Sequence, residues 1–403
     1  MRSLSTGSSA KRATVEGMIV IAASIVIQAS LGGVYAWSVF VPPLREAFNL
    51  TAGQAGIIFG VSIAAFTLTM LVSGPLQEAR GPRPVAALGG LVFGAGYVTA
   101  SLSGGAFPLL LLGVGVLTGA GIGLAYVCPL ATCIKWFPER KGLITGIAVA
   151  GFGSGAILLS NLVEFLLGRG VGILSIFRIV GIGFGALVVA GAMFLHTPPG
   201  GAGTAVHSRT GNLPLLRQRG FLALTAGMFA GTFGGLLVVG NLKPMALAAG
   251  LAGNAAAWSV SVFAVANAVG RIFWGLVHDR IGRAAIPFKL GLLALGALGF
   301  CLAHGSLMVM ASTVAVGAAF GGCFVLYAAE VAAIYGPGRV GTVYPKVFLI
   351  YGASGLLAPA MGGRLFDLFG TYAGANALSV FVALSGILVI RSLWAAKKPV
   401  PGV

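Results

Sequence analysis

An arginine lies in the middle of a long apolar run. Arg271 stands within the run from Ala255 to Leu276, in the stretch SVFAVANAVGRIFWGL. An arginine at the centre of a spanning helix costs about 2.5 to 3.5 kcal/mol on insertion scales, so it normally faces a wet cavity, a partner or an anionic ligand. No carboxylate stands at helical spacing from it, and Asn267, one turn earlier on the same face, is neutral. The pattern therefore predicts that the guanidinium binds a substrate carboxylate.

By position, Arg271 is also the one Lys or Arg that cannot reach a membrane surface. Lys289 stands in the first turn of its predicted span, where a long side chain can snorkel to the interface. We therefore expect a single cation at the centre of the membrane.

A bound carboxylate needs more than one arginine. The guanidinium can hold two oxygens at once, hydroxyl or amide donors can satisfy the remaining lone pairs, and apolar walls can hold a short alkyl end. The candidate donors in the spans are Tyr35, Tyr126, Asn241, Asn267 and Tyr351. Each aromatic side chain could instead pack against a neighbouring helix or face lipid.

Composition decides which elements must position these residues. The chain has 403 residues, of which 58% are hydrophobic and only 8% charged, and its mean hydropathy is +1.00, which excludes an ordinary soluble domain. Apolar runs of about twenty residues predict helices, whereas a transmembrane barrel would show shorter alternating segments. We predict an all-α integral membrane protein with twelve spans: 17–41, 53–76, 84–104, 107–132, 142–166, 172–196, 221–247, 255–277, 285–304, 306–334, 340–363 and 372–395.

Charge predicts how the chain crosses the membrane. The first apolar run is too long for a cleaved signal peptide, so we expect it to be retained as a helix. Twelve spans place both termini on one side, which holds seventeen Lys and Arg, whereas the other side holds Arg45, Arg169, Lys243 and Arg364. This asymmetry predicts cytoplasmic termini in the inner membrane.

The formal net charge of +17 is explained by this topology and by attraction to the lipid bilayer, which makes nucleic acid an unsuitable partner. The four cysteines all lie inside predicted spans, so we expect neither a disulfide nor a metal site.

The chain repeats itself at an offset of about 200 residues. GPLQEARGPR, residues 74–83, ends the second predicted span, and GLVHDRIGR, residues 275–283, ends the eighth. Paired glycines elsewhere keep nearly the same offset. The repeat predicts two six-helix halves, 1–196 and 221–403, joined by the polar linker 197–220.

These motifs resemble the major facilitator superfamily over the whole chain. Its signature, Gly-x-x-x-Asp-Arg-x-Gly-Arg, is matched by Gly275, Asp279, Arg280, Gly282 and Arg283, while the first copy keeps Glu78 and Arg80 in a degenerate form. The resemblance implies that this loop is a gate at the cytoplasmic rim; a solvated turn is the alternative. It also implies two bundles that rock about a cavity lined by spans one, four, seven and ten.

A narrower resemblance is carried by GGVYAWSVF, KWFPERKGLITG, YPKVFLIYGASG and the arginine of span eight. These segments resemble the branch of oxalate/formate antiporters and monocarboxylate porters. The resemblance implies transport of small organic anions without a cofactor. Carried over position by position, the substrate-binding side chains fall on Tyr35, Tyr126, Phe152, Arg271, Phe320, Phe324 and Tyr327.

The chain departs from this branch in span eleven and in span eight. Oxalate carriers place a lysine where this chain has Tyr351, and Lys346 lies about 7.5 Å along the helix and about 140° around it. Proton-coupled carriers have an aspartate where this chain has Asn267. One central cation favours a monocarboxylate such as lactate or pyruvate over oxalate, and the missing acid favours anion exchange.

Several alternatives remain open. A proton-coupled symporter would need another acid, and Glu330 or Lys346 could take part, although Glu330 could instead pair with the inner gate. An oxalate/formate-type antiporter, a membrane-embedded enzyme and a transporter-like sensor are also possible. The enzyme is disfavoured because no cluster of His, Cys or acidic residues falls at the membrane midplane. We expect a monomer.

Overall fold

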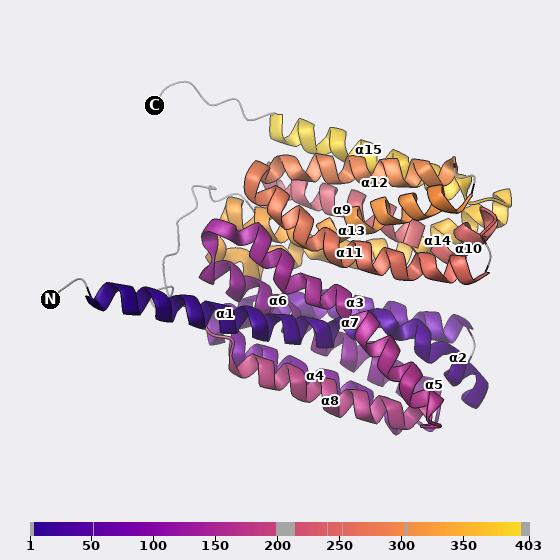
Figure 1. Cartoon of the computed structure of the whole chain (residues 1–403), viewed down its shortest axis with the longest axis horizontal. Coiled ribbons are helices and arrows are strands. Elements are labelled where there is room, and N and C mark those ends of the chain that lie inside the picture. The colour runs from indigo at the N-terminus through magenta and orange to yellow at the C-terminus, as the bar shows by residue number, and fades with distance from the viewer. Residues whose placement is uncertain are drawn as a thin grey trace. The chain divides into compact units, whose positions relative to one another are not determined.

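The computed structural model describes residues 4–50, 52–198, 214–239, 241–251, 253–302 and 305–395. Within these ranges the regular elements are all helices (Figure 1). Helices satisfy every backbone hydrogen bond internally, which a chain inside lipid requires. The predicted all-α class is confirmed.

The chain divides into two compact units. The first comprises 1–206 together with 331–345, and the second comprises 207–330 together with 346–403. This division differs from the predicted halves in assigning 331–345 to the first unit. Most of the predicted linker, residues 199–213, lies outside the described residues.

The first unit contains the helices of residues 4–193. They are α1 (Leu4–Gly32), η1 (Gly33–Ala36), α2 (Trp37–Phe48), α3 (Ala52–Arg80), α4 (Pro82–Ser101), α5 (Phe107–Leu110), η2 (Leu111–Thr118), α6 (Gly119–Trp136), η3 (Pro138–Arg140), α7 (Lys141–Gly168) and α8 (Ile173–Met193). The most extensive packing is between α4 and α8, α1 and α7, and α3 and α6.

The second unit begins with a short turn after the linker. Its elements are η4 (Leu215–Arg217), α9 (Arg219–Val239), α10 (Leu242–Ala248), α11 (Gly253–Ile281), η5 (Gly282–Ala284), α12 (Ala285–Cys301), most of α13 (Ser306–Tyr335), most of α14 (Val340–Phe369) and α15 (Ala373–Ala395). The ends of α13 and α14 and the turn η6 (Pro337–Arg339) between them belong to the first unit. Helix α15 packs against α9 and α12.

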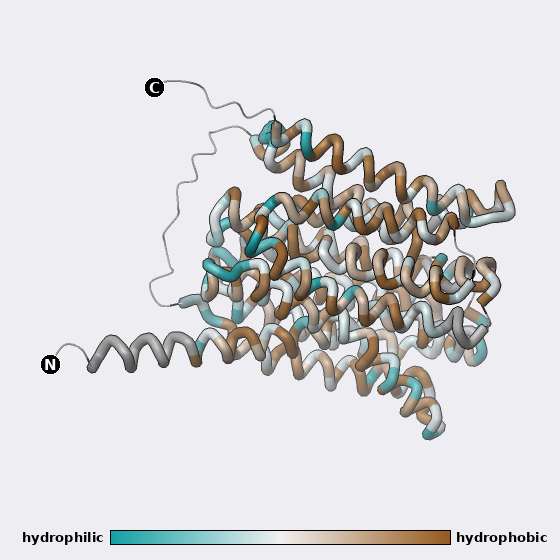
Figure 2. The backbone as a smooth tube through the Cα atoms, turned by 45° about the horizontal axis from the view of Figure 1, so that its top comes forward, coloured by the Kyte–Doolittle hydropathy of each residue, from teal (hydrophilic) through white to brown (hydrophobic). Residues whose placement is uncertain are grey.

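Eleven helical segments in the described residues are long and apolar enough to cross a membrane. The longest, Ser261–Cys301, has 41 residues and contains most of α11 together with η5 and α12. That length is about twice what a bilayer needs, so it accommodates the eighth and ninth predicted spans. Long stretches of these helices are coloured brown, as hydrophobic, in Figure 2. Many large apolar side chains, such as Leu307 and Leu295, are exposed, as lipid-facing residues are.

Three predicted spans are interrupted where hydropathy alone predicted one α-helix. Span one, 17–41, passes from α1 through η1 into α2, and span four, 107–132, passes from α5 through η2 into α6. Span seven, 221–247, ends as α9 and resumes as α10. Hydropathy does not detect these breaks because the residues around them remain apolar.

Glycines set the same helix crossing in both units. On α6, a Cβ at Gly123 would collide with the backbone carbonyl of Phe66 on α3. On α13, a Cβ at Gly321 would collide with the carbonyl of Asn267 on α11. Gly123 and Gly321 are 198 residues apart, and Phe66 and Asn267 are 201 apart. The repeat read in the sequence therefore recurs as a repeated contact in the structure.

Candidate functional site

Arg271 is fully buried on α11, with no exposed surface. Its Nε donates a hydrogen bond of 3.4 Å to Oδ1 of Asn267, one turn earlier. The guanidinium carbon lies 4.6 Å from the centre of the Phe324 ring on α13. A cation over an aromatic face is attracted by the ring and is most strongly attracted where water is excluded. These contacts hold the guanidinium between α11 and α13.

An aromatic cluster surrounds this position in the second unit. The rings of Phe324 and Tyr351 meet edge to face at 5.4 Å and 88°, and those of Phe320 and Phe324 at 5.2 Å and 84°. Phe348 on α14 adds a further contact, 6.0 Å from Phe324. The structure thus brings Arg271, Asn267, Phe320, Phe324 and Tyr351 together. One cation, one amide, one phenol and apolar walls match the needs of a short carboxylate.

The first unit holds a second aromatic cluster. Phe152 on α7 meets Tyr126 edge to face at 5.2 Å and 87°, and meets Tyr35 at 5.5 Å and 83°. Phe66 lies 5.1 Å from Tyr126 and was not predicted. The repeat held the signal for it, because Phe66 precedes Asn267 by 201 residues.

The two clusters occupy equivalent positions in the repeat. Tyr126 and Phe152 precede Phe324 and Tyr351 by 198 and 199 residues, and both pairs meet edge to face. The position equivalent to Arg271 is Met70. At this pair of equivalent positions, the second unit therefore has a cation, Arg271, and the first unit has a neutral side chain.

Two predicted substrate residues have other partners. Asn241 donates from Nδ2 to the carbonyl of Leu237, 3.1 Å away, at the break between α9 and α10. Tyr327 is buried and accepts a hydrogen bond of 3.3 Å from Nζ of Lys289. Their described contacts do not join them to Arg271.

The predicted snorkelling of Lys289 is wrong. The side chain has no exposed surface, and its ammonium donates to Sγ of Cys323 at 3.1 Å as well as to Tyr327. It reaches these groups because Gly231 on α9 leaves room where a Cβ would collide with Nζ. Arg271 is therefore not the one buried cation of the chain, as its position in the sequence had indicated.

The motif residues lie in the last turns of α11 and in the following turn, η5. Gly275 is buried, whereas Asp279, Arg280 and Arg283 are exposed and Gly282 adopts a positive φ of 56° that favours glycine. In the first copy, Glu78 and Arg80 are exposed at the end of α3, and Glu78 lies against Gly341 in the same unit.

Glu330 is buried near this motif and pairs with a residue that was not predicted. Its Oε2 lies 3.0 Å from Nε2 of His278 on α11, and the two side chains are only 6% and 2% exposed. The sequence signal for His278 was its position beside Asp279 in the motif. Lys346, the other coupling candidate, is exposed on α14.

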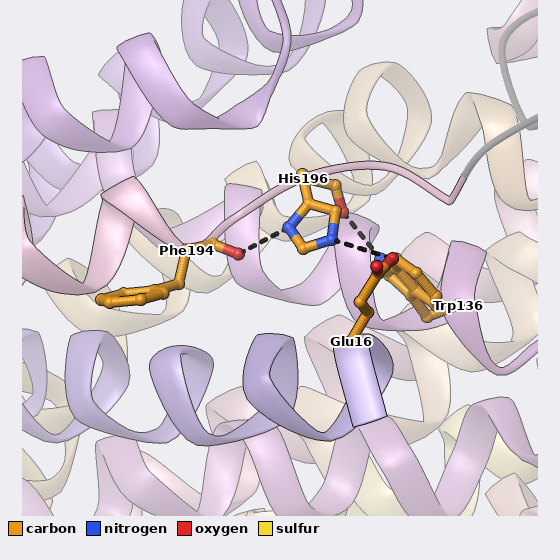
Figure 3. Close-up of polar contacts among 4 residues, drawn as sticks. All are labelled: Glu16, Trp136, Phe194 and His196. Carbon is orange, nitrogen blue, oxygen red and sulfur yellow. Dashed lines mark hydrogen bonds and ion pairs between the residues drawn. The ribbon is translucent and has the colours of Figure 1, made fainter. Parts of the chain in front are cut away.

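The motif KWFPERKG also has a defined structural contact (Figure 3). The indole of Trp136, at the end of α6, donates to the carbonyl of His196 at 2.7 Å, and the two rings meet edge to face at 5.3 Å. Nε2 of His196 lies 3.9 Å from Glu16 on α1. Trp136 therefore joins the ends of α6 and α8, next to α1.

A family model for the Major Facilitator Superfamily matches residues 22–242 and 221–403. The chain belongs to this superfamily. The match covers both units, in agreement with the resemblance drawn from the gate motif.

Other members of the superfamily are similar over most of their length. The "Oxalate:formate antiporter" of Oxalobacter formigenes is 27% identical over 91% of this chain and 88% of its own. "Monocarboxylate transporter 11" of Mus musculus is also 27% identical, over 94% and 87%. Among solved structures, a fucose:proton symporter of E. coli superposes with a TM-score of 0.73 at 15% identity, over 95% of this chain and all of its own, which supports the fold. The protein is thus a multi-pass membrane transporter of this superfamily.

Proposed function

We propose that this protein carries short monocarboxylates such as lactate and pyruvate across the membrane by exchanging one anion for another. The observation that carries the proposal is Arg271, fully buried beside Asn267 and facing Phe324. The relatives named for monocarboxylates and for oxalate and formate support the substrate class.

The charge of this site favours one carboxylate over two. A monocarboxylate neutralises Arg271, and a neutral complex crosses a low-dielectric region more easily than an unbalanced charge does. Lys289 does not change this assignment, because its ammonium binds Cys323 and Tyr327 and faces α9, whereas Arg271 faces Phe324. We therefore assign one cation to the substrate.

Counterflow in liposomes tests the proposal. Purified protein in vesicles preloaded with unlabelled pyruvate is expected to accumulate labelled pyruvate, with lactate competing better than oxalate. Arg271→Gln is expected to abolish the uptake, whereas Lys289→Met, which keeps a similar stem without the charge, is expected to retain both the uptake and the order of competition.

Two results would contradict it. Tighter competition by oxalate than by lactate would overturn the assignment of a single cation and favour a dicarboxylate antiporter. No stimulated uptake of any small carboxylate by protein that remains folded would favour a transporter-like sensor.

The motif at the end of α11 belongs to the same proposal. We propose that Gly275, Asp279, Arg280, Gly282 and Arg283 form a gate at the cytoplasmic rim, with Glu78 and Arg80 as its weaker counterpart. The exposure of the charged members is compatible with contacts that form in one state of the transport cycle and break in another.

A further inference from the structure

The pair of His278 and Glu330 lies about two turns beyond the proposed substrate site, towards the C-terminal end of the same two helices. His278 follows Arg271 by seven residues on α11, which places it on the same face about 10.5 Å along the axis. On α13, Glu330 follows Phe324 by six residues. Helices α11 and α13 therefore meet twice, through Arg271 with Phe324 and through His278 with Glu330.

The geometry of the imidazole identifies where a proton can bind. An ionised Glu330 only accepts hydrogen bonds, so Nε2 of His278, 3.0 Å away, must carry a proton. In a neutral imidazole the other nitrogen, Nδ1, is then an acceptor. Within the described part of the chain Nδ1 is buried and makes no hydrogen bond. A buried acceptor without a hydrogen bond is unfavourable, so this nitrogen is a favourable place for a proton.

A second carboxylate faces this nitrogen. Oδ1 of Asp279 lies 3.9 Å from Nδ1, and its side chain is 17% exposed against 2% for His278. A proton that arrives from solvent at Asp279 can pass to Nδ1, and the resulting imidazolium then stands between two carboxylates. Asp279, His278 and Glu330 thus form a path from the exposed end of α11 into the interior of the second unit.

We propose that His278 and Glu330 form the proton-binding site of this carrier, which the proton enters by way of Asp279. The proposal rests on the carrier function proposed above and adds a coupling ion to it. In the reaction, a hydronium ion from the aqueous phase gives its proton to Nδ1 of neutral His278 and leaves as water, and the pair changes from one negative charge to none.

This change of charge matches the charge of the substrate. Before proton binding, the negative charge of Glu330 on α13 balances Arg271 on α11, so these groups together carry no net charge in the empty carrier. The neutral complex of Arg271 and one monocarboxylate described above therefore requires the pair to have bound its proton. One proton and one monocarboxylate bound together leave that sum unchanged, whereas a monocarboxylate bound alone makes it negative. Since unbalanced charge is costly in a low-dielectric interior, the loaded carrier holds the proton, and the empty carrier returns once the proton has left. When the carrier exchanges one anion for another, a proton crosses in each direction and no net proton movement results. When it moves an anion in one direction and returns empty, one proton crosses with each anion.

The other charged and titratable groups near the pair are either exposed to solvent or hydrogen-bonded to other residues. Arg280 and Arg283 are exposed on the adjoining turn, so water screens them. Lys289 is bound to Tyr327, which precedes Glu330 by three residues, and Tyr335 follows on the same helix. Lys289 contributes the same charge to the loaded and the empty carrier.

Liposome transport by the full-length protein tests the proposal with labelled pyruvate. Two assays are run on each protein: counterflow into preloaded vesicles at equal pH, and uptake into empty vesicles with an acidic exterior, with an internal pH dye reporting proton entry. The wild type is expected to perform both and to move one proton for each anion taken up. Glu330→Gln fixes the pair without its negative charge, so it is expected to keep counterflow and to lose the uptake driven by the pH gradient.

His278→Gln is the second variant, because an amide can still donate to Glu330 but cannot take the proton. Because Glu330 then keeps its charge, the loaded carrier stays negative, and this variant is expected to be slowed in both assays. The double variant His278→Gln/Glu330→Gln removes that charge and is expected to recover counterflow without the gradient-driven uptake. Glu164→Gln, an exposed carboxylate on α7, is the matched control that is expected to retain both. Counterflow by Glu330→Gln and by the double variant shows that these proteins are folded. Undiminished gradient-driven uptake in both Glu330→Gln and His278→Gln, or net uptake by the wild type without protons, would overturn the coupling site and leave the carrier standing. Absence of counterflow in the wild type would overturn the carrier proposal and the coupling role with it.

Discussion

Arg271 contacts an amide and an aromatic ring, two groups that suit a planar guanidinium. Its Nε meets the Asn267 amide, and its planar group lies over the face of Phe324. A lysine ammonium is a point charge that cannot bind two carboxylate oxygens in a fork and that stacks less well on a ring. The shape of the cation therefore matters here as much as its charge.

We accordingly expect Arg271→Lys to lose most of its transport while the protein remains folded. Losing a charge-assisted hydrogen bond costs roughly 1.5 to 3 kcal/mol, which corresponds to about a tenfold to hundredfold weaker affinity for the anion. The measurement is labelled pyruvate counterflow at equal protein, with Arg178→Lys on the exposed side of α8 as the matched control. Counterflow of Arg271→Lys within twofold of the wild type would show that charge alone is sufficient.

At this scale the sequence predicted the burial of Arg271 better than the packing around it. The cost of an arginine in an apolar run pointed to Arg271, and the family resemblance pointed to Phe324 and to the position of Tyr351. Lys289 was misjudged because its height in the span suggested a surface position, whereas Gly231 opens a path inward. His278 was missed because its partner, Glu330, is 52 residues away and only packing brings them together.

At the scale of elements, hydropathy predicted the helices because lipid requires long apolar segments. It could not predict the breaks after α1 and α9, which depend on backbone conformation rather than on polarity. The packing of the helices depends on single glycines, and the repeated pattern of these glycines was visible in the sequence. Their structural role became evident only from the carbonyl groups that they contact, those of Phe66 and Asn267.

We expect Gly123→Leu and Gly321→Leu to destabilise the protein, each by forcing one helix pair apart. Overpacking of a well-packed interior typically costs about 1 to 3 kcal/mol. Gly183→Leu on α8 is the matched control, since a Cβ there meets nothing within 4 Å. Thermal unfolding in detergent is expected to show a lower midpoint for the first two variants only. Equal midpoints in all three would mean that these crossings tolerate a side chain.

At the scale of the whole molecule, the distribution of Lys and Arg predicts the orientation in the membrane. Gly168, at the end of α7, and Gly338, in η6, fall on opposite sides in this topology, and a Cβ at either meets nothing within 4 Å. We expect a membrane-impermeant maleimide to label Gly168→Cys in intact cells and Gly338→Cys only after permeabilisation. The reverse order would place both termini outside the cytoplasm.

The internal repeat also separates the two copies chemically. Where the second unit has Arg271, His278 and Glu330, the offsets of 201 and 198 residues place Met70, Gln77 and Thr132 in the first. The second copy therefore carries the cation and the proposed proton-binding pair, whereas the first presents neutral side chains at these three positions and keeps an acid at Glu78, the equivalent of Asp279. A carrier divided in this way can evolve a new choice of ion by changes in one copy, while changes in the other alter the fit of the substrate and leave the accompanying charge as it was.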